Sequence, residues 1–243
     1  MEHMKKTIGS IILFLAIGLF AGVGHAAGVL TPIGSRHQPI QIRDHHVNVV
    51  INNGFAMTEV YQTFYNPNPE ELEAMYSSPL PKSASLSEVT YYVGEREING
   101  EVLEKDKARK IYEDEKSKGN ESGLAEKNEF YTFEFKVFPV PANDETRIRF
   151  LYYQPLKIDT GVGRYLYPLE EGGTDEVGMS FWTTNTKVEN TFSMNLELKS
   201  AYPVQDVRVP GFEAAPTITD REEGHHKLEM QLTDMSLTRD FIF

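Results

Sequence analysis

Apolar and polar residues alternate with a period of two along several stretches of this chain. In VNVVI, Val47, Val49 and Ile51 share one face of an extended segment, and the same pattern recurs in residues 88–95, 131–137 and 147–152. This alternation predicts antiparallel strands with one buried face and one face in water. The intervening stretches NNG, NPNP, PAND and EEGG are rich in turn-forming residues. Strands this closely spaced, without helical patterns between them, predict an all-β fold of the sandwich or barrel type.

The alternation restarts after about Asp175. The stretches FSMNLELK at 192–199 and KLEMQLT at 227–233 each place apolar residues at every second position. We therefore expect an additional, smaller β-strand unit over residues 176–243. The pattern leaves open whether this unit stands alone or completes the first sandwich.

One densely charged segment, EKDKARKIYEDEKSKG at 104–119, departs from the strand pattern. Its apolar residues Ala108, Ile111 and Tyr112 follow the i, i+3, i+4 spacing of an amphipathic helix. Asp114 and Lys118 form an acid-first i, i+4 pair, and the segment ends at a glycine. We expect one short inserted helix that covers an end or edge of the sheet and carries no chemistry.

The first 26 residues have the composition of a secretory signal peptide. Lys5 and Lys6 precede an uncharged apolar run, Thr7 to Gly24, and the sequence HAAG follows it. A basic amino-terminal region, an apolar run and small residues before the cleavage site predict export, with cleavage after Ala26. The alternative is a retained membrane anchor, because the run approaches the length that spans a bilayer. After cleavage, the protein would be periplasmic, on the cell surface or secreted, without membrane insertion.

Charge and cysteine content exclude several classes of function. The formal net charge is −12 at pH 7, and the chain contains no cysteine. An acidic chain repels phosphate backbones, so we expect no nucleic-acid partner. Without cysteine there is no cysteine nucleophile, no thiolate metal site and no disulfide, so stability must come from burial.

Two acidic clusters could carry chemistry, Glu70, Glu71 and Glu73 in one and Glu170 and Glu171 in the other. Converging carboxylates catalyse glycoside hydrolysis, and carboxylates in a suitable loop bind Ca²⁺. However, no D-x-D-x-D-G sequence accompanies either cluster, and both fall in polar turns. We therefore expect solvated acids at these positions.

Histidine occurs in two adjacent pairs, His45–His46 and His225–His226. Neighbouring side chains on a strand point to opposite faces, so neither pair can chelate one ion by itself. No H-E-x-x-H sequence is present. We therefore expect no metal at the histidines.

The sequence DMSLT, from Asp234 through Ser236 to Thr238, resembles a metal-ion-dependent adhesion loop. Such a loop follows a buried, continuously apolar strand and enters a helix, whereas the preceding residues here alternate. We interpret the match as coincidental. The sequence thus predicts no catalytic, cofactor-binding or metal-ligating residues, and no cofactor.

Three blocks of sequence, taken together, resemble a known family. They are TEVYQTFYNPNPEELEAMYSSPLP at 58–81, GEREINGEVLEKDKARKIYE at 94–113 and RIRFLYYQPL at 147–156. In this order they resemble the VIT domain of inter-alpha-trypsin inhibitor heavy chains and vault poly(ADP-ribose) polymerase. The resemblance covers residues 28–157. Two positions depart from the family pattern, Ser78 where an aromatic residue is usual and PVPAND where a P-P-G-like turn is usual.

The resemblance implies an antiparallel, sandwich-like domain with one inserted helix and no catalytic residues. Exported members of this layout commonly continue into a von Willebrand type A domain, which carries metal-dependent binding. On that basis, we expect residues 176–243 to lead towards such a domain in a longer protein, because SLTRDFIF ends on apolar residues.

Two functional hypotheses follow. The first is a non-enzymatic, extracytoplasmic interaction or scaffold module of an adhesion-type protein, whose partner is a protein or a matrix or envelope ligand. The second is a hydrolase of envelope glycans, which requires two carboxylates about 5–10 Å apart in a cleft.

Overall fold

The structure of the protein is a computed structural model. It describes residues 28–34, 36–100, 130–169, 187–212, 216–222, 224–236 and 240–243. The predicted signal peptide at 1–26 and the predicted helix at 104–119 lie outside these residues. Within them, every regular element is a strand, so the all-β prediction is confirmed. In the same ranges, no helix has the length and apolar character needed to cross a membrane.

The strands are long where the sequence alternates. They are β1 (Val29–Pro32), β2 (Gln41–Asn52), β3 (Phe55–Tyr65), β4 (Leu72–Pro81), β5 (Ser85–Val93), β6 (Arg96–Asn99), β7 (Phe130–Val140), β8 (Glu145–Pro155), β9 (Lys157–Asp159), β10 (Val162–Arg164), β11 (Leu166–Tyr167), β12 (Lys187–Lys199), β13 (Thr217–Glu222), β14 (His225–Ser236) and β15 (Phe241–Ile242).

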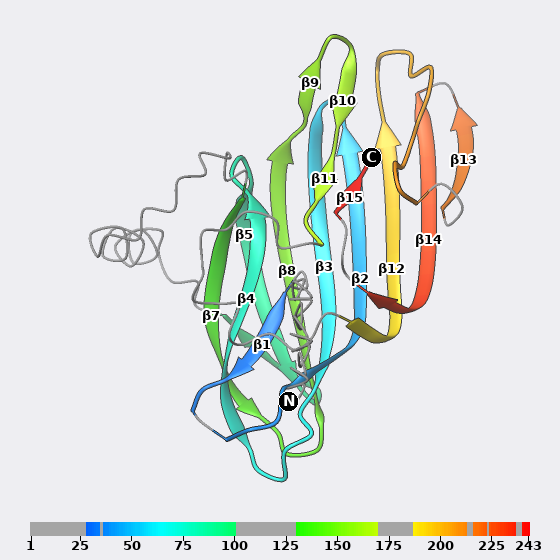
Figure 1. The fold of residues 1–243 in the computed structure, drawn as a ribbon. Helices are drawn as coiled ribbons and strands as arrows, with labels where there is room; N and C mark the ends of the chain where they lie inside the picture. The colour runs from blue at the N-terminus through cyan, green and yellow to red at the C-terminus, as the bar shows by residue number, and fades with distance from the viewer. Residues whose placement is uncertain are drawn as a thin grey trace, which may run out of the picture.

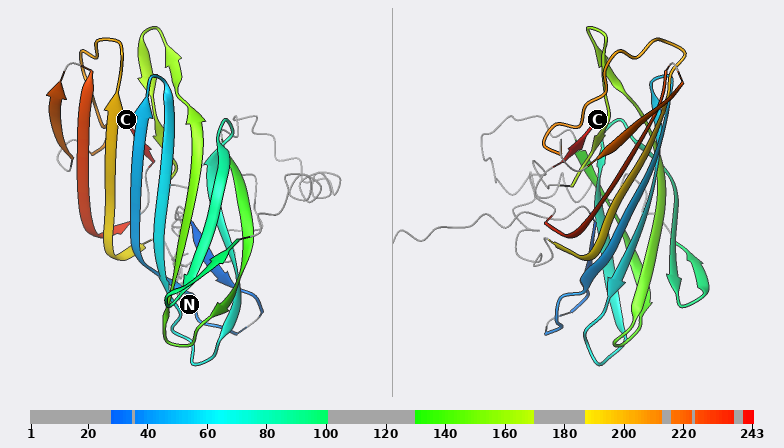
Figure 2. Two further views of the ribbon diagram at one scale, coloured as in Figure 1. Left: turned by 180° about the vertical axis from the view of Figure 1, so that it is seen from behind. Right: turned by 90° about the vertical axis from the view of Figure 1, so that its right-hand side faces the viewer.

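Two sheets form the body of the molecule. The large sheet has the order β13-β14-β12-β2-β3-β8-β5-β6, and the small sheet has the order β1-β4-β7. Figure 1 shows the small sheet packed against one side of the large sheet, and the edge-on view in Figure 2 shows the twist of the large sheet. The arrangement is therefore a β-sandwich in which one layer is much wider than the other.

The two long stretches of alternation near the carboxyl end join the large sheet. β12 lies antiparallel to β14 and parallel to β2, with Met194 opposite Val47. This is the single parallel pairing in the described sheets; all other neighbours run antiparallel. Residues 187–236 thus extend the sheet that β2 and β3 begin.

The core follows from the alternation. On β2, the side chains of Val47, Val49 and Ile51 are buried while those between them are partly exposed. Aromatic side chains fill the space between the sheets, with Tyr76 of β4 5.0 Å from Phe135 and 6.1 Å from Phe150 between ring centroids. Such tilted aromatic contacts add to the free energy gained from burial alone. Tyr76 therefore lies at the centre of the packing between the two sheets.

Candidate functional site

A chain of hydrogen-bonded polar side chains crosses the interior between the sheets. The Tyr76 hydroxyl on β4 donates to Gln62 Oε1 on β3 at 2.6 Å, and Gln62 Nε2 donates to His45 Nδ1 on β2 at 3.2 Å. Because Nδ1 of His45 accepts a hydrogen bond, the neutral ring carries its proton on Nε2. His45 Nε2 lies 2.7 Å from the hydroxyl of Tyr167 on β11, to which it donates. We call these four residues the His45 network.

Burial keeps the His45 ring neutral. Burial, together with a smaller effect of the neighbouring His46, lowers the pKa of His45 from 6.5 to about 3. Phe192 presents its ring to the imidazole at 5.4 Å between centroids, in an edge-on arrangement. All four members of the network are buried. The network therefore joins β2, β3, β4 and β11 and is closed to solvent, which favours a structural role.

A second buried cluster holds the end of the chain against the sheet. Thr58 Oγ1 lies 2.8 Å from the Tyr165 hydroxyl. The backbones of Tyr165 and Phe243 exchange two hydrogen bonds, of 2.8 and 2.9 Å. Asp240 Oδ1 accepts from the Leu169 amide at 2.9 Å. Burial raises the pKa of Tyr165 well above its ordinary value, so its hydroxyl stays protonated and able to donate.

The other histidines on the strands of the large sheet, His46, His225 and His226, are distributed over its two faces. His46 Nδ1 lies 2.7 Å from Ser193 Oγ, and His225 Nε2 lies 2.8 Å from Glu197 Oε1. His226 is buried, on the face opposite to His225. Within the part of the chain that the structure describes, no three His, Asp or Glu side chains are grouped to hold a metal ion.

The acidic cluster Glu70, Glu71 and Glu73 lies at one end of the sandwich. Glu70 pairs with His37 Nδ1 at 3.3 Å, and Glu73 pairs with Lys136 Nζ at 3.1 Å. Glu71 is exposed. Each of these two acids therefore contacts a basic side chain of its own, and the two basic side chains lie on different elements. Glu170 and Glu171, the other candidate pair, lie outside the described residues.

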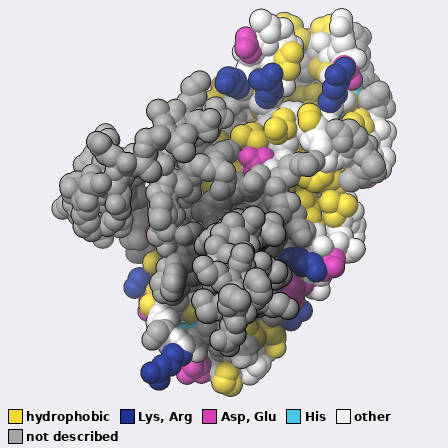
Figure 3. All heavy atoms as spheres, viewed as in Figure 1, with side chains coloured by type: hydrophobic (Ala, Val, Ile, Leu, Met, Phe, Trp, Pro, Cys, Tyr) yellow, Lys and Arg dark blue, Asp and Glu magenta, His cyan; other side chains and the backbone are white. Residues whose placement is uncertain are grey.

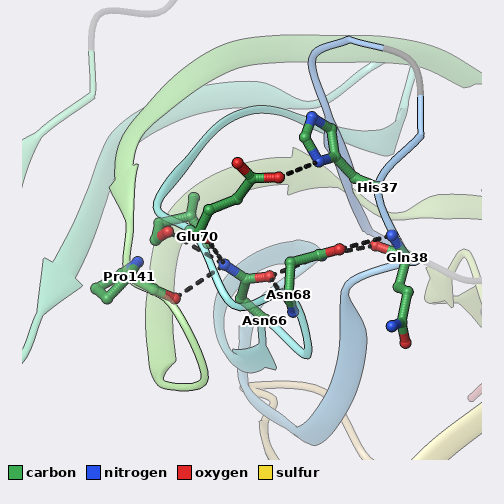
Figure 4. Close-up of polar contacts among 7 residues, drawn as sticks. His37, Gln38, Asn66, Asn68, Glu70 and Pro141 are labelled. Atoms are coloured by element: carbon green, nitrogen blue, oxygen red, sulfur yellow. Dashed lines mark hydrogen bonds and ion pairs between the residues drawn. The ribbon is translucent and has the colours of Figure 1, made fainter.

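Beside this cluster, the NPNP turn ties three loops together (Figure 4). Asn66 Nδ2 donates to the carbonyl oxygens of Glu70 at 3.1 Å and Pro141 at 2.9 Å. Asn68 exchanges two hydrogen bonds with the backbone of Gln38, of 2.7 and 3.0 Å. Both asparagines are buried. They satisfy backbone groups that three crossing loops would otherwise leave unpaired, which is a structural role.

Asp234 of the adhesion-like sequence lies near the end of β14. It has a left-handed φ of 59°, and its Oδ1 lies 2.5 Å from Lys187 Nζ. Thr238 lies outside the described residues. Asp234 is thus held in an exposed ion pair at the end of a strand.

At the opposite end of the sandwich, three loops meet around the turn between β2 and β3. Asn53 and Gly54 have φ values of 48° and 89°, as a tight two-residue hairpin turn requires. Asn53 Oδ1 accepts from the Ala201 amide at 2.7 Å, and Gly54 O accepts from the Leu156 amide at 2.7 Å. We call this end, formed by the β2–β3 turn, the β9–β10 hairpin and residues 200–204, the loop end. It lies at the top of Figure 1.

Exposed apolar side chains gather at the loop end. Phe55, Ile158 and Tyr202 are 65%, 64% and 77% exposed, one from each of its three parts. Half of the ten large apolar side chains that are exposed in the described residues lie at or beside this end: Phe55, Tyr153, Ile158, Val162 and Tyr202. Figure 3 shows apolar side chains there next to Lys and Arg side chains. Apolar groups that remain exposed on ordered loops are typical of interaction sites.

Sequence reasoning did not single out the loop end. Its one local signal is Phe55, an aromatic residue directly after the turn sequence NNG, at an outward position of the alternation. The contribution of Ile158 and Tyr202 depends on which loops meet in space. Pairing between strands that are far apart in the sequence brings these loops together.

Comparison with protein families gives a match within the two sheets. The model of the vault protein inter-alpha-trypsin domain, abbreviated VIT, matches residues 42–152. This range starts in β2 and ends in β8, so it contains strands of both sheets.

The curated relatives are much longer than this chain. The mouse protein mono-ADP-ribosyltransferase PARP4 is 23% identical over 193 residues, which are 75% of this chain and 10% of that protein. A von Willebrand factor A domain-containing protein of Dictyostelium discoideum is 21% identical over 180 residues, or 72% of this chain and 18% of that protein. The similarity therefore concerns one region of each relative.

A solved structure shares the architecture. A protein from Legionella pneumophila, described as a candidate nutrient binding protein, superposes with a TM-score of 0.52. It is 12% identical, and the match covers 90% of this chain and 71% of that one. The family match and the relatives lead to one conclusion: residues 42–152 of this chain match the VIT domain.

Proposed function

We propose that this chain is a non-enzymatic interaction module of an adhesion-type protein, and that it binds its partner through the loop end. The single observation that carries the proposal is the exposure of Phe55, Ile158 and Tyr202 on three loops that hydrogen bonds hold together. Burying three large apolar side chains at an interface is worth several kcal/mol. Ordered loops also reduce the entropy that binding costs.

The relatives support this class of function. This chain matches the VIT domain, and several proteins that resemble it are named for a von Willebrand factor A domain. That combination suggests a module that acts through contacts with other proteins. We propose a protein or a matrix or envelope ligand as the partner.

The polar residues support a non-enzymatic role. The His45 network is closed to solvent, and Glu70 and Glu73 each contact a different basic side chain. A glycan hydrolase would instead need two carboxylates that converge on one bond. The interaction module is therefore the hypothesis that these contacts favour.

The leader sequence supports an extracytoplasmic location. Residues 1–26 combine a basic amino-terminal region, an apolar run and small residues before the expected cleavage site. The absence of cysteine is compatible with an oxidising compartment, because no thiol is present to form an incorrect disulfide.

Photo-cross-linking in the native host tests the proposal. A photoreactive phenylalanine analogue replaces Tyr202 at the loop end or, as a control, Glu71 at the opposite end. We expect a discrete protein adduct from position 202 and none from position 71. Adducts of equal yield from both positions, or adducts only from position 71, would refute the loop end as the binding surface.

A further inference from the structure

Two cations face each other across the β9–β10 hairpin of the loop end. Lys157 of β9 is directly opposite Arg164 of β10 in the strand register, and both side chains are exposed. Among the residues that the structure describes, neither side chain forms an ion pair with a carboxylate. Like charges in directly opposite positions destabilise an antiparallel pair of strands. The hairpin therefore carries an unfavourable repulsion on the surface that we propose for binding.

A shortage of acids does not explain this arrangement. The chain has 36 Asp and Glu residues against 24 Lys and Arg residues. On the same protein, Arg149 of β8 contacts Glu59 at 2.7 Å. Lys199, at the end of β12 next to the loop end, contacts Glu197 at 3.0 Å. The two hairpin cations thus lack acids on a protein in which acids are abundant.

The backbone at the base of the hairpin is fixed on both sides of the cations. Leu156, which precedes the first cation, donates its amide to the β2–β3 turn at 2.7 Å. Tyr165, which follows the second cation, is fully buried, and its hydroxyl lies 2.8 Å from Thr58 Oγ1. The strands cannot move apart here without breaking these contacts. The two like charges are therefore held next to each other.

The face of the hairpin that carries the cations also presents an apolar group. Val162 shares this face, because residues two apart on a strand point to the same side, and its side chain is 50% exposed. Asp159, opposite Val162, is the one acid of residues 157–164, so two cations and one acid give this hairpin a net charge of +1. The net charge of the whole chain is −12. The hairpin is thus a small basic and apolar surface on an acidic protein.

We propose that the partner of the loop end is a protein segment that places two carboxylates against Lys157 and Arg164 and an apolar side chain against Val162. The inference rests on the proposed function, because it concerns the same surface. Carboxylates of the partner supply the ion pairs that the free hairpin lacks, and the planar guanidinium of Arg164 suits a bidentate contact. Binding thereby removes the repulsion between the two cations.

A membrane surface is a less suitable partner for this hairpin. Segments that are recruited to anionic lipids carry clusters of about four to eight Lys and Arg residues. The hairpin has two, and the net charge of −12 repels an anionic surface. Two cations at a fixed separation instead match two carboxylates on one segment of a protein.

Charge reversal tests the inference through the cross-link from position 202. Lys157→Glu with Arg164→Glu is introduced into the chain that carries the photoreactive analogue at this position, in the native host. We expect the yield of the protein adduct to fall at least about 10-fold, because carboxylates then oppose carboxylates. Mass spectrometry of the adduct should identify a peptide that contains at least two Asp or Glu residues.

A matched control changes the net charge by the same amount at the opposite end of the sandwich. Arg36→Glu with Arg96→Glu reverses two exposed cations, one in the β1–β2 connection and one on β6. The 11 residues of β3 separate the two ends by about 30 Å. Charges that far apart in solvent are screened, so the adduct yield should stay within about twofold of the wild type.

A single reversal separates binding from folding. Lys157→Glu creates an opposite-charge pair with Arg164 across the hairpin. The melting temperature should therefore equal or exceed that of the wild type, while the adduct yield falls at least about 3-fold. Lys157→Arg keeps the charge and should keep the yield. A loss of yield without a loss of stability excludes unfolding as its cause.

Each outcome decides the proposal. An adduct yield that the double reversal leaves unchanged would overturn it, as would an equal loss in the Arg36→Glu, Arg96→Glu control or an adduct with lipid instead of peptide. In these cases the loop end remains the binding surface and only the acidic partner is refuted. Absence of any adduct from position 202 in the otherwise unchanged chain would refute the proposed function and this inference together.

Discussion

Gln62 and Tyr76 join the two sheets of this protein through a buried hydrogen bond of 2.6 Å. Gln62 lies on β3 of the large sheet and Tyr76 on β4 of the small sheet. The amide of Gln62 also donates to His45, so one side chain fixes the positions of two others. In a buried setting, a hydrogen bond of this kind specifies how the layers pack, because loss of either partner leaves the other unsatisfied.

The first prediction concerns that bond. Gln62→Leu removes an acceptor for Tyr76 and a donor for His45 while it keeps the volume approximately constant. We expect it to lower the free energy of unfolding by about 2–4 kcal/mol, because two buried polar groups lose their partner. Urea denaturation followed by circular dichroism measures the change. Asn48→Ala serves as a control, because Asn48 makes an exposed hydrogen bond to Asn195. If Gln62→Leu lowered the free energy of unfolding no more than this control does, the role of the network would be contradicted.

The second prediction is a pH dependence that belongs to His45. Its pKa is about 3 in the folded protein and near 6.5 when the chain is unfolded. Between these values the unfolded state binds one more proton, so the free energy of unfolding falls as the pH falls from 6.5 towards 3. The slope attributable to this residue approaches about 1.4 kcal/mol per pH unit.

Comparison with a variant separates the contribution of His45 to the pH dependence of stability from the contribution of the carboxylates. His45→Phe has no titrating group at this position, so its stability should fall less steeply between pH 6.5 and pH 4 than that of the wild type. Urea midpoints at several pH values provide the measurement. Parallel curves for the two proteins would show that His45 does not titrate differently in the folded and unfolded states.

The third prediction concerns the loops opposite the loop end. Asn66→Ala removes a side chain that donates to the carbonyls of Glu70 and Pro141 and accepts from Asn68. We expect a loss of about 3 kcal/mol, since several buried backbone groups lose a partner at once. Thermal unfolding measures the effect. A melting temperature equal to that of the wild type would mean that water replaces the amide without cost.

The fourth prediction separates the adhesion-like sequence from metal binding. Lys187 already holds the Asp234 carboxylate in an exposed ion pair. Asp234→Ala should therefore change the free energy of unfolding by less than about 1 kcal/mol. Titration calorimetry of the wild type with Mg²⁺ should show no binding that this substitution removes. A micromolar site that disappears in Asp234→Ala would contradict our reading of DMSLT.

The strands could be predicted from the sequence because alternation is a local signal. In a strand with one solvent-exposed face, every second side chain points into the core. Val47, Val49 and Ile51 occupy these positions, and all three are buried. Local patterns do not encode which strand lies beside which. The parallel pairing of β12 with β2, which makes residues 187–236 part of the large sheet, therefore could not be predicted.

The candidate site was accessible to prediction only in part. Adjacent histidines were expected to point to opposite faces, and His45 is buried while His46 contacts Ser193 on the outer face. The partners of His45 come from β3 and β11, at sequence separations of 17 and 122 residues. No spacing rule connects residues that far apart. The loop end depends in the same way on three loops that only the assembled sheet brings together.

The most direct test of the central claim is the affinity of the loop end for the partner that cross-linking identifies. The double substitution of Phe55 and Ile158 by serine removes two exposed apolar side chains from the loop end. The control, Ile33→Ser, removes an exposed apolar side chain at the opposite end of the sandwich. There the Ile33 amide donates a hydrogen bond to the Glu73 carbonyl. Both changes are on the surface, so folding should be retained. We predict that the dissociation constant measured by calorimetry rises at least about 10-fold for the double variant and stays within twofold for Ile33→Ser. An unchanged dissociation constant in the double variant, or an equal loss in Ile33→Ser, would contradict the account.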